Sequence, residues 1–430
     1  MSSVLGVTLP NSWRSAPLKH VTSTLTRGSA PDYVDAGPVR VISQASNQAS
    51  GLDWSRTRFH DFNGNAKSLK GHLRPNDVLI NSTGTGTLGR VGYFTDSPDG
   101  LPCMADSHVT IARANPGQLD ARFSYYWLSS NPFQEYAYAA LVVGATNQIE
   151  LNRDRLGDAP VPLPPLDEQR RIAEVLDAQT ARIDALAAKR RRMRDLLTLK
   201  RERVIVSVLG LERGNSPHRL VPLKYLVGSV SVGIVVTPAK WYVDSAGTPA
   251  LRGLNVKPGS INSDDLVHIS AEGHAEHVKS WLRTGDVVVV RTGQAGAAAV
   301  VPPEFDGANC IDLIIVRPDD RLISRYLEYV LNSEHARAQV SEHSVGSIQA
   351  HFNVSAMKQI PLPSLSRNEQ DETVARLDQA VDKIDRLQDK LAKQERLLAL
   401  HRQALITAAV TGQFDASTAS GRNVTEGVTA

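Results

Sequence analysis

The stretch PLPPLDEQ at residues 162–169 decides the architecture of this chain, because it returns as PLPSLSRNEQ at residues 361–370. Each copy leads into a long, charged segment with regularly spaced apolar residues. The two copies lie about 200 residues apart, which is much longer than the repeating unit of a solenoid. The sequence therefore predicts a duplicated domain, each copy of which ends in a helical segment.

The rest of each half repeats in the same order, and the offset drifts slowly, as small insertions after an ancient duplication would produce. The cysteines Cys103 and Cys310 also align, each ahead of a strand-like run. The other correspondences are PLK 17–19 with 222–224, DVLINSTG 77–84 with DVVVVRTG 286–293, and RFSYYWLSS 122–130 with RYLEYVLNS 325–333.

The part of each half before the proline-rich junction alternates short β-rich runs with Gly, Pro, Asn and Asp. Examples are DVLIN at 77–81 and DLIIV at 312–316. Only one clear helix, around Tyr125 to Leu128, interrupts these runs in the first half. This pattern predicts an α+β domain built on an antiparallel or barrel-like sheet.

The segments after the two junctions have the signals of long helices. Asp167 is expected as the N-cap of the first, and Ser366 with Glu369 has the spacing of a capping box for the second. Both patterns end at a glycine, Gly210 or Gly412, where a C′ residue is expected. Roughly 40 residues give helices of about 60 Å. The apolar residues with heptad spacing are Leu176, Ile183, Leu186, Met193 and Leu197, then Val374, Leu377, Val381, Ile384, Leu391, Leu398 and Leu405.

Polar residues also occupy some heptad positions of these apolar seams. At such positions polar residues fix the register and pairing of the helices at some cost in stability. They are Gln179 and Arg190 in the first helix and Gln388, Glu395 and Arg402 in the second. We expect the two helices to pair as an antiparallel coiled coil, with the alternative that each packs only on its own domain. The basic run at 189–194 fits a solvated helix face or a phosphate contact, of which the first is the more common.

Composition sets the class of protein. The 430 residues are 41% hydrophobic and 22% charged, as in ordinary globular proteins, and no apolar run is long enough to cross a bilayer. The start of the chain lacks the layout of a signal peptide, so we expect a cytoplasmic protein. The two cysteines are interpreted as core residues in a reducing compartment. A net charge of +3 permits nucleic acid as a partner without arguing for it.

Apparent catalytic motifs lack the context that their chemistry needs. GTGTLG at 84–89 has the letters of a dinucleotide fingerprint, but RVGYF follows it and is typical of a strand, whereas the fingerprint requires a helix. We interpret this stretch and its counterpart near Gly293 as tight turns between strands. His268, His274 and His277 lack a convincing ligand frame, so the sequence predicts no catalytic residue, metal or cofactor.

With these observations in hand, the chain resembles the specificity subunit of type I restriction-modification systems over almost its full length. The residues that carry the resemblance are the twin junctions at 162–169 and 361–370, the G-x-x-x-Q stretch at 144–148 with a shorter copy at 346–349, and the helix end AAVTGQFD at 408–415. The second junction has two extra residues before Glu369, and the first helix has a looser ending at 207–210.

The resemblance implies a non-catalytic protein that reads two halves of a split DNA site, with the helices as a spacer. The fold it implies has two mixed α/β target recognition domains, separated by two long helices that pair as an antiparallel coiled coil with a pseudo-twofold axis. The implied partners are double-stranded DNA, DNA adenine methyltransferase (modification) subunits and a restriction/translocase subunit, with no membrane. The expected divisions are target recognition domain 1 at 1–164, spacer helix 1 at 165–212, target recognition domain 2 at 213–363, spacer helix 2 at 364–413 and a flexible tail at 414–430.

Reading bases requires side chains that form paired hydrogen bonds with base edges, and phosphates are contacted by the same residue types. Two other classes of function stay open at this point. One is a coiled-coil adaptor or scaffold without DNA specificity, and the other is an enzyme such as a nuclease, which the lack of a duplicated carboxylate cluster disfavours. The candidate DNA contacts are Arg56, Arg58, Lys67, Lys70, Thr83, Thr85, Arg90, Asn147 and Gln148 in the first half, and Arg291, Thr292, Gln294, Gln349 and His351 in the second.

Overall fold

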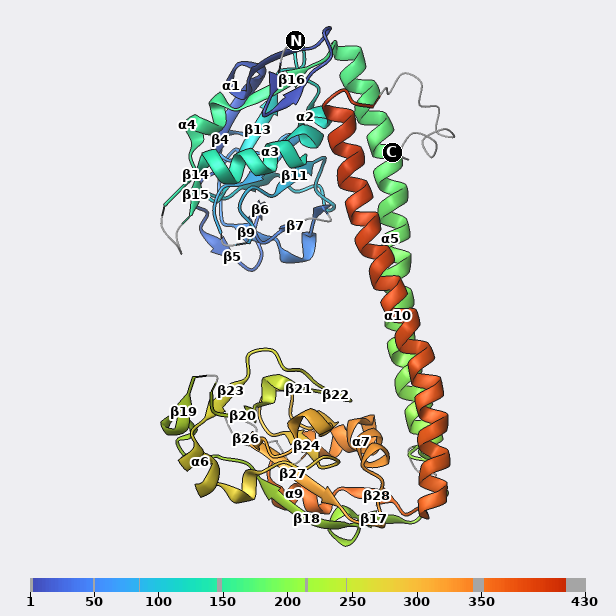
Figure 1. The fold of residues 1–430 in the computed structure, drawn as a ribbon. Helices are drawn as coiled ribbons and strands as arrows, with labels where there is room; N and C mark the ends of the chain where they lie inside the picture. Colours follow the sequence, from blue (N-terminus) through green and yellow to red (C-terminus); the bar gives the residue numbers. More distant parts are fainter. Residues whose placement is uncertain are drawn as a thin grey trace. The chain divides into compact units, whose positions relative to one another are not determined.

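The computed structural model describes residues 3–48, 51–84, 86–144, 149–212, 216–244, 246–342 and 352–414 (Figure 1). The chain divides into two compact units. Unit 1 comprises residues 1–190 and 393–430, and unit 2 comprises residues 191–392. Each unit therefore contains one globular part and a portion of both long helices. Among the described residues, no helix is both long and apolar enough to cross a membrane.

Unit 1 is built on two four-stranded sheets. The first is antiparallel, and the second contains the parallel pair β12 and β6. The first sheet has the order β11 (Val91–Phe94), β10 (Asp77–Asn81), β13 (Val109–Ala114) and β4 (Thr22–Arg27). The second has the order β12 (Cys103–Ala105), β6 (Val39–Ile42), β9 (Arg58–His60) and β5 (Tyr33–Val34). The helices are α1 (Leu18–Val21), α2 (Ala121–Leu128), α3 (Asn131–Tyr136) and α4 (Arg153–Asp158).

Unit 2 repeats both sheets in the same strand order, which confirms the α+β class and the duplication. The first sheet runs β25 (Ala298–Val300), β24 (Val287–Val290), β27 (Leu313–Pro318) and β18 (Val227–Val232). The second runs β26 (Asn309–Cys310), β20 (Thr248–Leu251), β23 (Val267–Ile269) and β19 (Tyr242–Val243). The helices are α6 (Ala271–Glu276), α7 (Ser324–Asn332), α8 (Glu334–Glu342) and α9 (Val354–Gln359).

Strand pairing corrects the alignment of the two cysteines. Ala105 lies opposite Ile42 in unit 1, and Cys310 lies opposite Leu251 at the same point of the unit 2 sheet. Cys310 thus corresponds to Ala105, two residues beyond Cys103. The shift is tolerated because these positions share one face of a strand and each accepts a small apolar side chain. Both thiols are free and buried, as expected of core residues.

The junction peptides form a short sheet that leads into each long helix. β16 (Pro160–Leu163) pairs with β3 (Arg14–Pro17), and β28 (Pro361–Pro363) pairs with β17 (Leu220–Pro222). The helices that follow are α5 (Leu166–Val208) and α10 (Arg367–Val410). Proline has no backbone N–H to donate to a neighbouring strand, and its ring prevents a helix from extending to residues before it. The proline-rich peptide therefore fits a short edge strand that stops before a helix.

The expected ends of the long helices are confirmed except at one position. Ser366 and Glu369 form the capping box, since Glu369 Oε2 accepts from the Ser366 amide at 2.7 Å and Ser366 Oγ accepts from the Glu369 amide at 3.4 Å. The expected N-cap at Asp167 is wrong, because α5 begins at Leu166, and the carbonyl of Pro165 accepts from the amides of Glu168 and Gln169. Asp167 instead pairs with Arg170.

The carboxyl ends close with the same device. Gly210 and Gly412 have φ of +63° and +73°. The amide of Leu211 donates to the carbonyl of Val206, and the amide of Gln413 to that of Ala408. These are the long-range bonds of a Schellman motif, which requires a left-handed residue at C′. Glycine occupies that position because it adopts a positive φ without a steric cost.

The two long helices pair antiparallel. In unit 2, Gln388 Nε2 donates to Thr198 Oγ1 at 2.8 Å, and Arg201 pairs with Asp385 at 3.1 Å, so numbers rise along one helix as they fall along the other. In unit 1, Arg402 pairs with Asp184 at 3.0 Å. The polar seam residues Gln388 and Arg402 therefore make contacts between helices, as predicted.

The alternative that each long helix packs only on its own domain is wrong, because the two helices contact each other and each globular part packs on both. The unit 1 core contains Ile172 and Leu176 from α5 together with Ile406 and Val410 from α10. The unit 2 core contains Ile205 from α5 together with Leu377 and Val381 from α10, among other residues. The seam is weakest near the middle of α5, where Leu186 and Met193 are 46% and 44% exposed.

Candidate nucleic-acid interface

The glycine-rich stretch after β10 is a turn between antiparallel strands. Gly84, Gly86 and Gly89 all have positive φ, and β11 follows and pairs with β10. Gly293 and Gly296 have the same conformation between β24 and β25. A strand in place of a helix leaves no helix N-terminus to receive a pyrophosphate. The structure thus confirms the interpretation of both stretches as tight turns.

Equivalent threonines stand at the start of these two turns and carry different partners. Thr83 Oγ1 lies 2.8 Å from His108 Nδ1, and Thr292 Oγ1 donates to Asp312 Oδ2 at 3.1 Å. Strand register matches the two pairs, since Asn81 opposite Val109 corresponds to Val290 opposite Leu313. The same exposed corner of the sheet therefore presents an imidazole in unit 1 and a carboxylate in unit 2.

Two candidate arginines are held by contacts within their own units. Arg90 donates to the carbonyl of Asn47 at 3.1 Å and to Gln48 Oε1 at 3.0 Å. Arg291 pairs with Asp312 at 2.6 Å and donates to the carbonyl of Phe352 at 3.1 Å. Either arginine would have to give up these hydrogen bonds to contact DNA. In the free protein the same bonds hold the turns next to the two arginines.

The remaining described candidates are exposed. Arg56 pairs with Asp53 at 2.9 Å, whereas Arg58 lies on β9 with its guanidinium carbon 4.3 Å from the centre of the Tyr33 ring. Lys67 lies in the short 3-10 helix Ala66–Ser68, and Lys70 and Gln294 lie in exposed turns. Thr85, Asn147, Gln148, Gln349 and His351 lie outside the described residues.

Tyr33 and Asp106 were not among the candidates, although their side chains form a connected group with Arg58. Tyr33 donates its hydroxyl to Asp106 Oδ2 at 3.2 Å, and the Asp106 amide donates to the carbonyl of Ile42. Burial and the nearby Asp106 carboxylate raise the pKa of Tyr33 to about 12. Sequence spacing gave no sign of this group, because its members lie on strands that pair only in the folded sheet.

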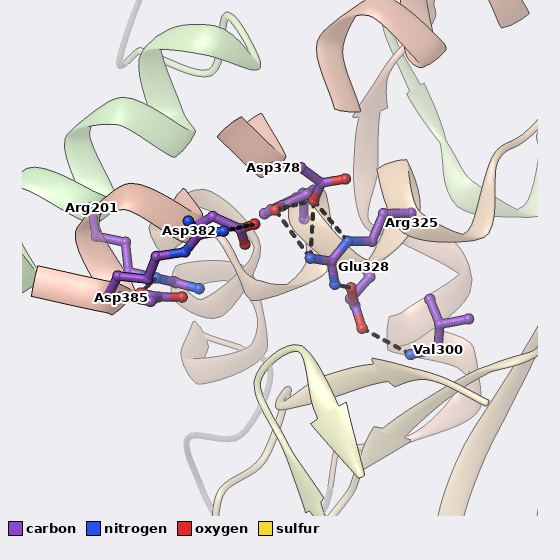
Figure 2. A network of polar contacts seen from close by, with 9 residues as sticks. Arg201, Val300, Arg325, Glu328, Asp378, Asp382 and Asp385 are labelled. Carbon is purple, nitrogen blue, oxygen red and sulfur yellow. Dashed lines mark hydrogen bonds and ion pairs between the residues drawn. The ribbon is translucent and has the colours of Figure 1, made fainter. Parts of the chain in front are cut away.

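A repeated polar contact joins each globular part to the first turns of its own long helix. In unit 2, Asp378 of α10 accepts from Arg325 at 3.0 Å and from the Tyr329 hydroxyl at 2.6 Å, as Figure 2 shows for Arg325. Glu328 bonds the same guanidinium and accepts from the Val300 amide at 2.9 Å. Burial and the hydrogen bond to Asp378 raise the pKa of Tyr329 well above its usual value.

Unit 1 has the same arrangement at α5. Asp177 accepts from Arg122 at 2.6 Å and from the Tyr126 hydroxyl at 2.5 Å. The buried side chains of Gln169 and Gln370 add a second matched contact, since each accepts from a backbone amide just before α2 or α7 and donates to two carbonyls. The glutamine of the repeated junction motif thus fixes the start of each long helix to its globular part.

Two of the three histidines singled out in the sequence make local contacts, and the third, His268, lies on β23. His274 stacks on Trp281 with ring centres 4.3 Å apart and bonds Asn309, and His277 bonds the carbonyl of Gly273. No group of three His, Cys, Asp or Glu side chains suited to a metal occurs in the part of the chain that the structure describes.

Comparison with known proteins agrees with the resemblance seen in the sequence. Residues 63–192 match the family model of the type I restriction modification DNA specificity domain. The specificity subunit of the type I restriction enzyme EcoBI from Escherichia coli is 22% identical over 79% of this chain and 78% of its own length. That of StySPI from Salmonella potsdam is 25% identical over 86% of this chain and 82% of its own.

Two solved structures share the fold. One, from a study of complex assembly and conformational transition of the type I R-M system, has a TM-score of 0.73 at 20% identity and covers 95% of this chain and 100% of that chain. The other, the HsdS subunit from Thermoanaerobacter tengcongensis, has a TM-score of 0.51 at 19% identity and covers 95% and 99%.

Residues 63–192 therefore carry the DNA specificity domain of type I restriction-modification systems. Along most of its length the chain is similar to the specificity subunits of these systems.

Proposed function

We propose that the chain is a non-catalytic, sequence-specific DNA-binding subunit that reads a bipartite site in double-stranded DNA. The globular parts at 1–164 and 213–363 are the two target recognition domains, and the helices at 165–212 and 364–413 are the spacer. The specificity-domain match and the similarity to specificity subunits support this assignment. The proposed partners are DNA adenine methyltransferase subunits and a restriction/translocase subunit, which would carry out the chemistry in the cytoplasm.

The observation that carries the proposal is a shared framework with different exposed polar groups. The two units have the same strand order and the same helix anchors, yet the corner at Thr83 and Thr292 offers His108 in one and Asp312 in the other. Base edges are distinguished by the pattern of donors and acceptors presented to them. Two copies that differ at such positions would read different half-sites, whereas a pure scaffold gains nothing from the difference.

Continuous helices support the spacer role. α5 and α10 extend over 43 and 44 residues, and each contributes to both units. A two-part reader must meet its half-sites at a defined separation, so helix length would set the number of unread base pairs. Covalent linkage also makes the second contact intramolecular, which raises affinity without new contacts.

The direct test is binding of the full chain, assembled with its modification subunits, to randomised duplexes at several salt concentrations. We expect selection of a split motif with a constant gap. We also expect affinity to fall steeply with salt, on the order of a thousandfold between about 50 and 200 mM for some six phosphate contacts. Affinity that is flat with salt and no enriched motif would contradict the proposal and favour an adaptor.

A further inference from the structure

Strand β9 of the second sheet in unit 1 carries an exposed guanidinium that lies over an aromatic ring. Arg58 and His60 lie on the same face of β9, and Tyr33 pairs with His60 from β5, so Arg58 is the diagonal neighbour of Tyr33. The Arg58 guanidinium carbon stands 4.3 Å from the Tyr33 ring centre. A cation over an aromatic face at this distance is attracted by the ring quadrupole.

The Tyr33 ring under Arg58 is held in place by a hydrogen bond from its hydroxyl to a buried carboxylate. Tyr33 donates to Asp106, a residue that is 3% exposed and whose other carboxylate oxygen accepts from the His108 amide at 2.8 Å. The three residues thus form a column from the sheet interior to the surface. Fixing a long side chain before binding removes part of the entropy cost of ordering it at an interface.

The donors of Arg58 remain available to a ligand. Its side chain is exposed and donates no hydrogen bond to any described residue, unlike Arg56, Arg90 and Arg291. A guanidinium that stacks through its face keeps its N–H groups pointing outward along its edge, in the fork that matches two acceptors side by side. In DNA, guanine O6 and N7 present such a pair in the major groove.

Unit 2 retains the ring and lacks the charges. Tyr242 pairs with Ile269 as Tyr33 pairs with His60, and the two tyrosines are 39% and 38% exposed. The position of Arg58 is taken by Val267, its diagonal neighbour across the same strands. The position of Asp106 is taken by Ile311, whose amide bonds Leu251 as that of Asp106 bonds Ile42. The charged residues at the two ends of the column, Arg58 and Asp106, thus correspond to apolar residues in unit 2.

Resting on the proposed function, we propose that Arg58 is a specificity-determining residue that reads a guanine in one half-site, with Tyr33 and Asp106 as its positioning residues. The guanidinium fork also matches a pair of phosphate oxygens, so the test must separate a base contact from a phosphate contact. The matched column of Val267 and Tyr242 makes no bidentate contact, so this base preference belongs to one half-site only.

The test uses the full chain with its modification subunits and selection from randomised duplexes, comparing the wild type with Arg58→Val, which installs the unit 2 residue. We expect Arg58→Val to lose preference for G·C at one base pair of one half-site by about 5- to 150-fold, while the other half-site and the gap stay unchanged. Arg58→Lys keeps the charge without the planar fork and should lose most of the same preference. Arg153→Val, the same change at an exposed arginine of unit 1 paired with Asp154, is the matched control and should leave the motif unaltered.

The outcomes separate the inference from the function on which it rests. If Arg58→Val lowers affinity for all sequences equally and leaves the motif intact, Arg58 contacts phosphate and the inference is overturned. If Arg58→Lys retains the full G·C preference, a point charge suffices and the bidentate reading is likewise overturned. If the wild-type complex selects no split motif, the proposed function itself fails, whatever the variants do.

Discussion

At the scale of single residues, duplication separates the side chains that hold the fold from those that are free to differ. The pair Asp77 and Arg113 recurs as Asp286 and Arg317, and each aspartate carboxylate is almost fully buried. Arg58 recurs as Val267. A position whose charge is buried and paired tolerates no loss of one partner, whereas an exposed one does.

The buried pair in unit 1 gives a direct prediction. Asp77→Ala removes the carboxylate that accepts from Arg113 Nε and Nη2, both at 2.7 Å, and leaves an uncompensated guanidinium. We expect the free energy of unfolding of unit 1 to fall by about 3 kcal/mol, measured by urea denaturation. The double change Asp77→Leu with Arg113→Leu should recover part of the loss, because neither charge is then left alone. Asp158→Ala, which breaks only the exposed pair with Lys19, is the control and should have little effect. Equal losses for the single and double variants would show that packing, and not charge, dominates.

At the scale of elements, the ends of the long helices could be predicted from sequence more securely than the sheets. The caps act through hydrogen bonds between residues at most five apart, so they can be predicted from local spacing alone. They are formed by Ser366, Glu369, Gly210 and Gly412. The misplaced N-cap at Asp167 shows the limit, because a preceding proline carbonyl took that role. The column of Tyr33, Arg58 and Asp106 could not be predicted, since it depends on which strands pair and in which register.

The capping box predicts a pH dependence. Hydrogen bonds from the Ser366 hydroxyl and then from its amide lower the pKa of Glu369 below its ordinary value. A lowered pKa in the folded state means that the charged form stabilises the helix end above the unfolded-state pKa, and that this stability is lost as pH falls through the folded-state pKa. We expect Glu369→Gln to lower the Tm at pH 7 and the difference from the wild type to shrink towards pH 3. Glu372→Gln, one turn further on and exposed, should show no such pH-dependent difference. A Tm difference that is constant over this range would contradict the assignment.

The contact between α7 and α10 predicts that two nearby aspartates differ in importance. Asp378 accepts from Arg325 (Figure 2) and from Tyr329, whereas Asp382 pairs with exposed Arg386 at 3.8 Å. We expect Asp378→Ala to destabilise unit 2 by about 1 to 2 kcal/mol, because hydrogen bonds to a charged group are lost at a half-exposed site. Hydrogen exchange should then be faster in α7. Asp382→Ala should leave both unchanged, and similar effects for the two variants would show that the contact does not hold α7 to the helix.

At the scale of the whole molecule, the sequence predicted the duplication, the α+β class and the pairing of the long helices, because each leaves a mark that survives divergence. Repeated junction peptides and heptad spacing are marks of this kind. The proposed base contacts leave no such mark. Arg90 and Arg291 had the right residue type, yet both are engaged inside their units, and only the folded strands reveal Arg58 as available.

The spacer role makes a prediction about the molecule as a whole. Deleting one heptad from each long helix, residues 187–193 and 393–399, keeps the remaining apolar seams in phase and shortens the pair by about 10 Å. At 3.4 Å per base pair this corresponds to about three base pairs. We expect the complex with modification subunits to select a gap shorter by about three base pairs, or to lose specific binding if the half-sites then face different sides of the duplex. Replacing the same two heptads by others of equal length should preserve the gap, because length and not local sequence sets the spacing. A double-deletion complex that still selects the wild-type gap would contradict the spacer role and leave the helices as docking surfaces alone.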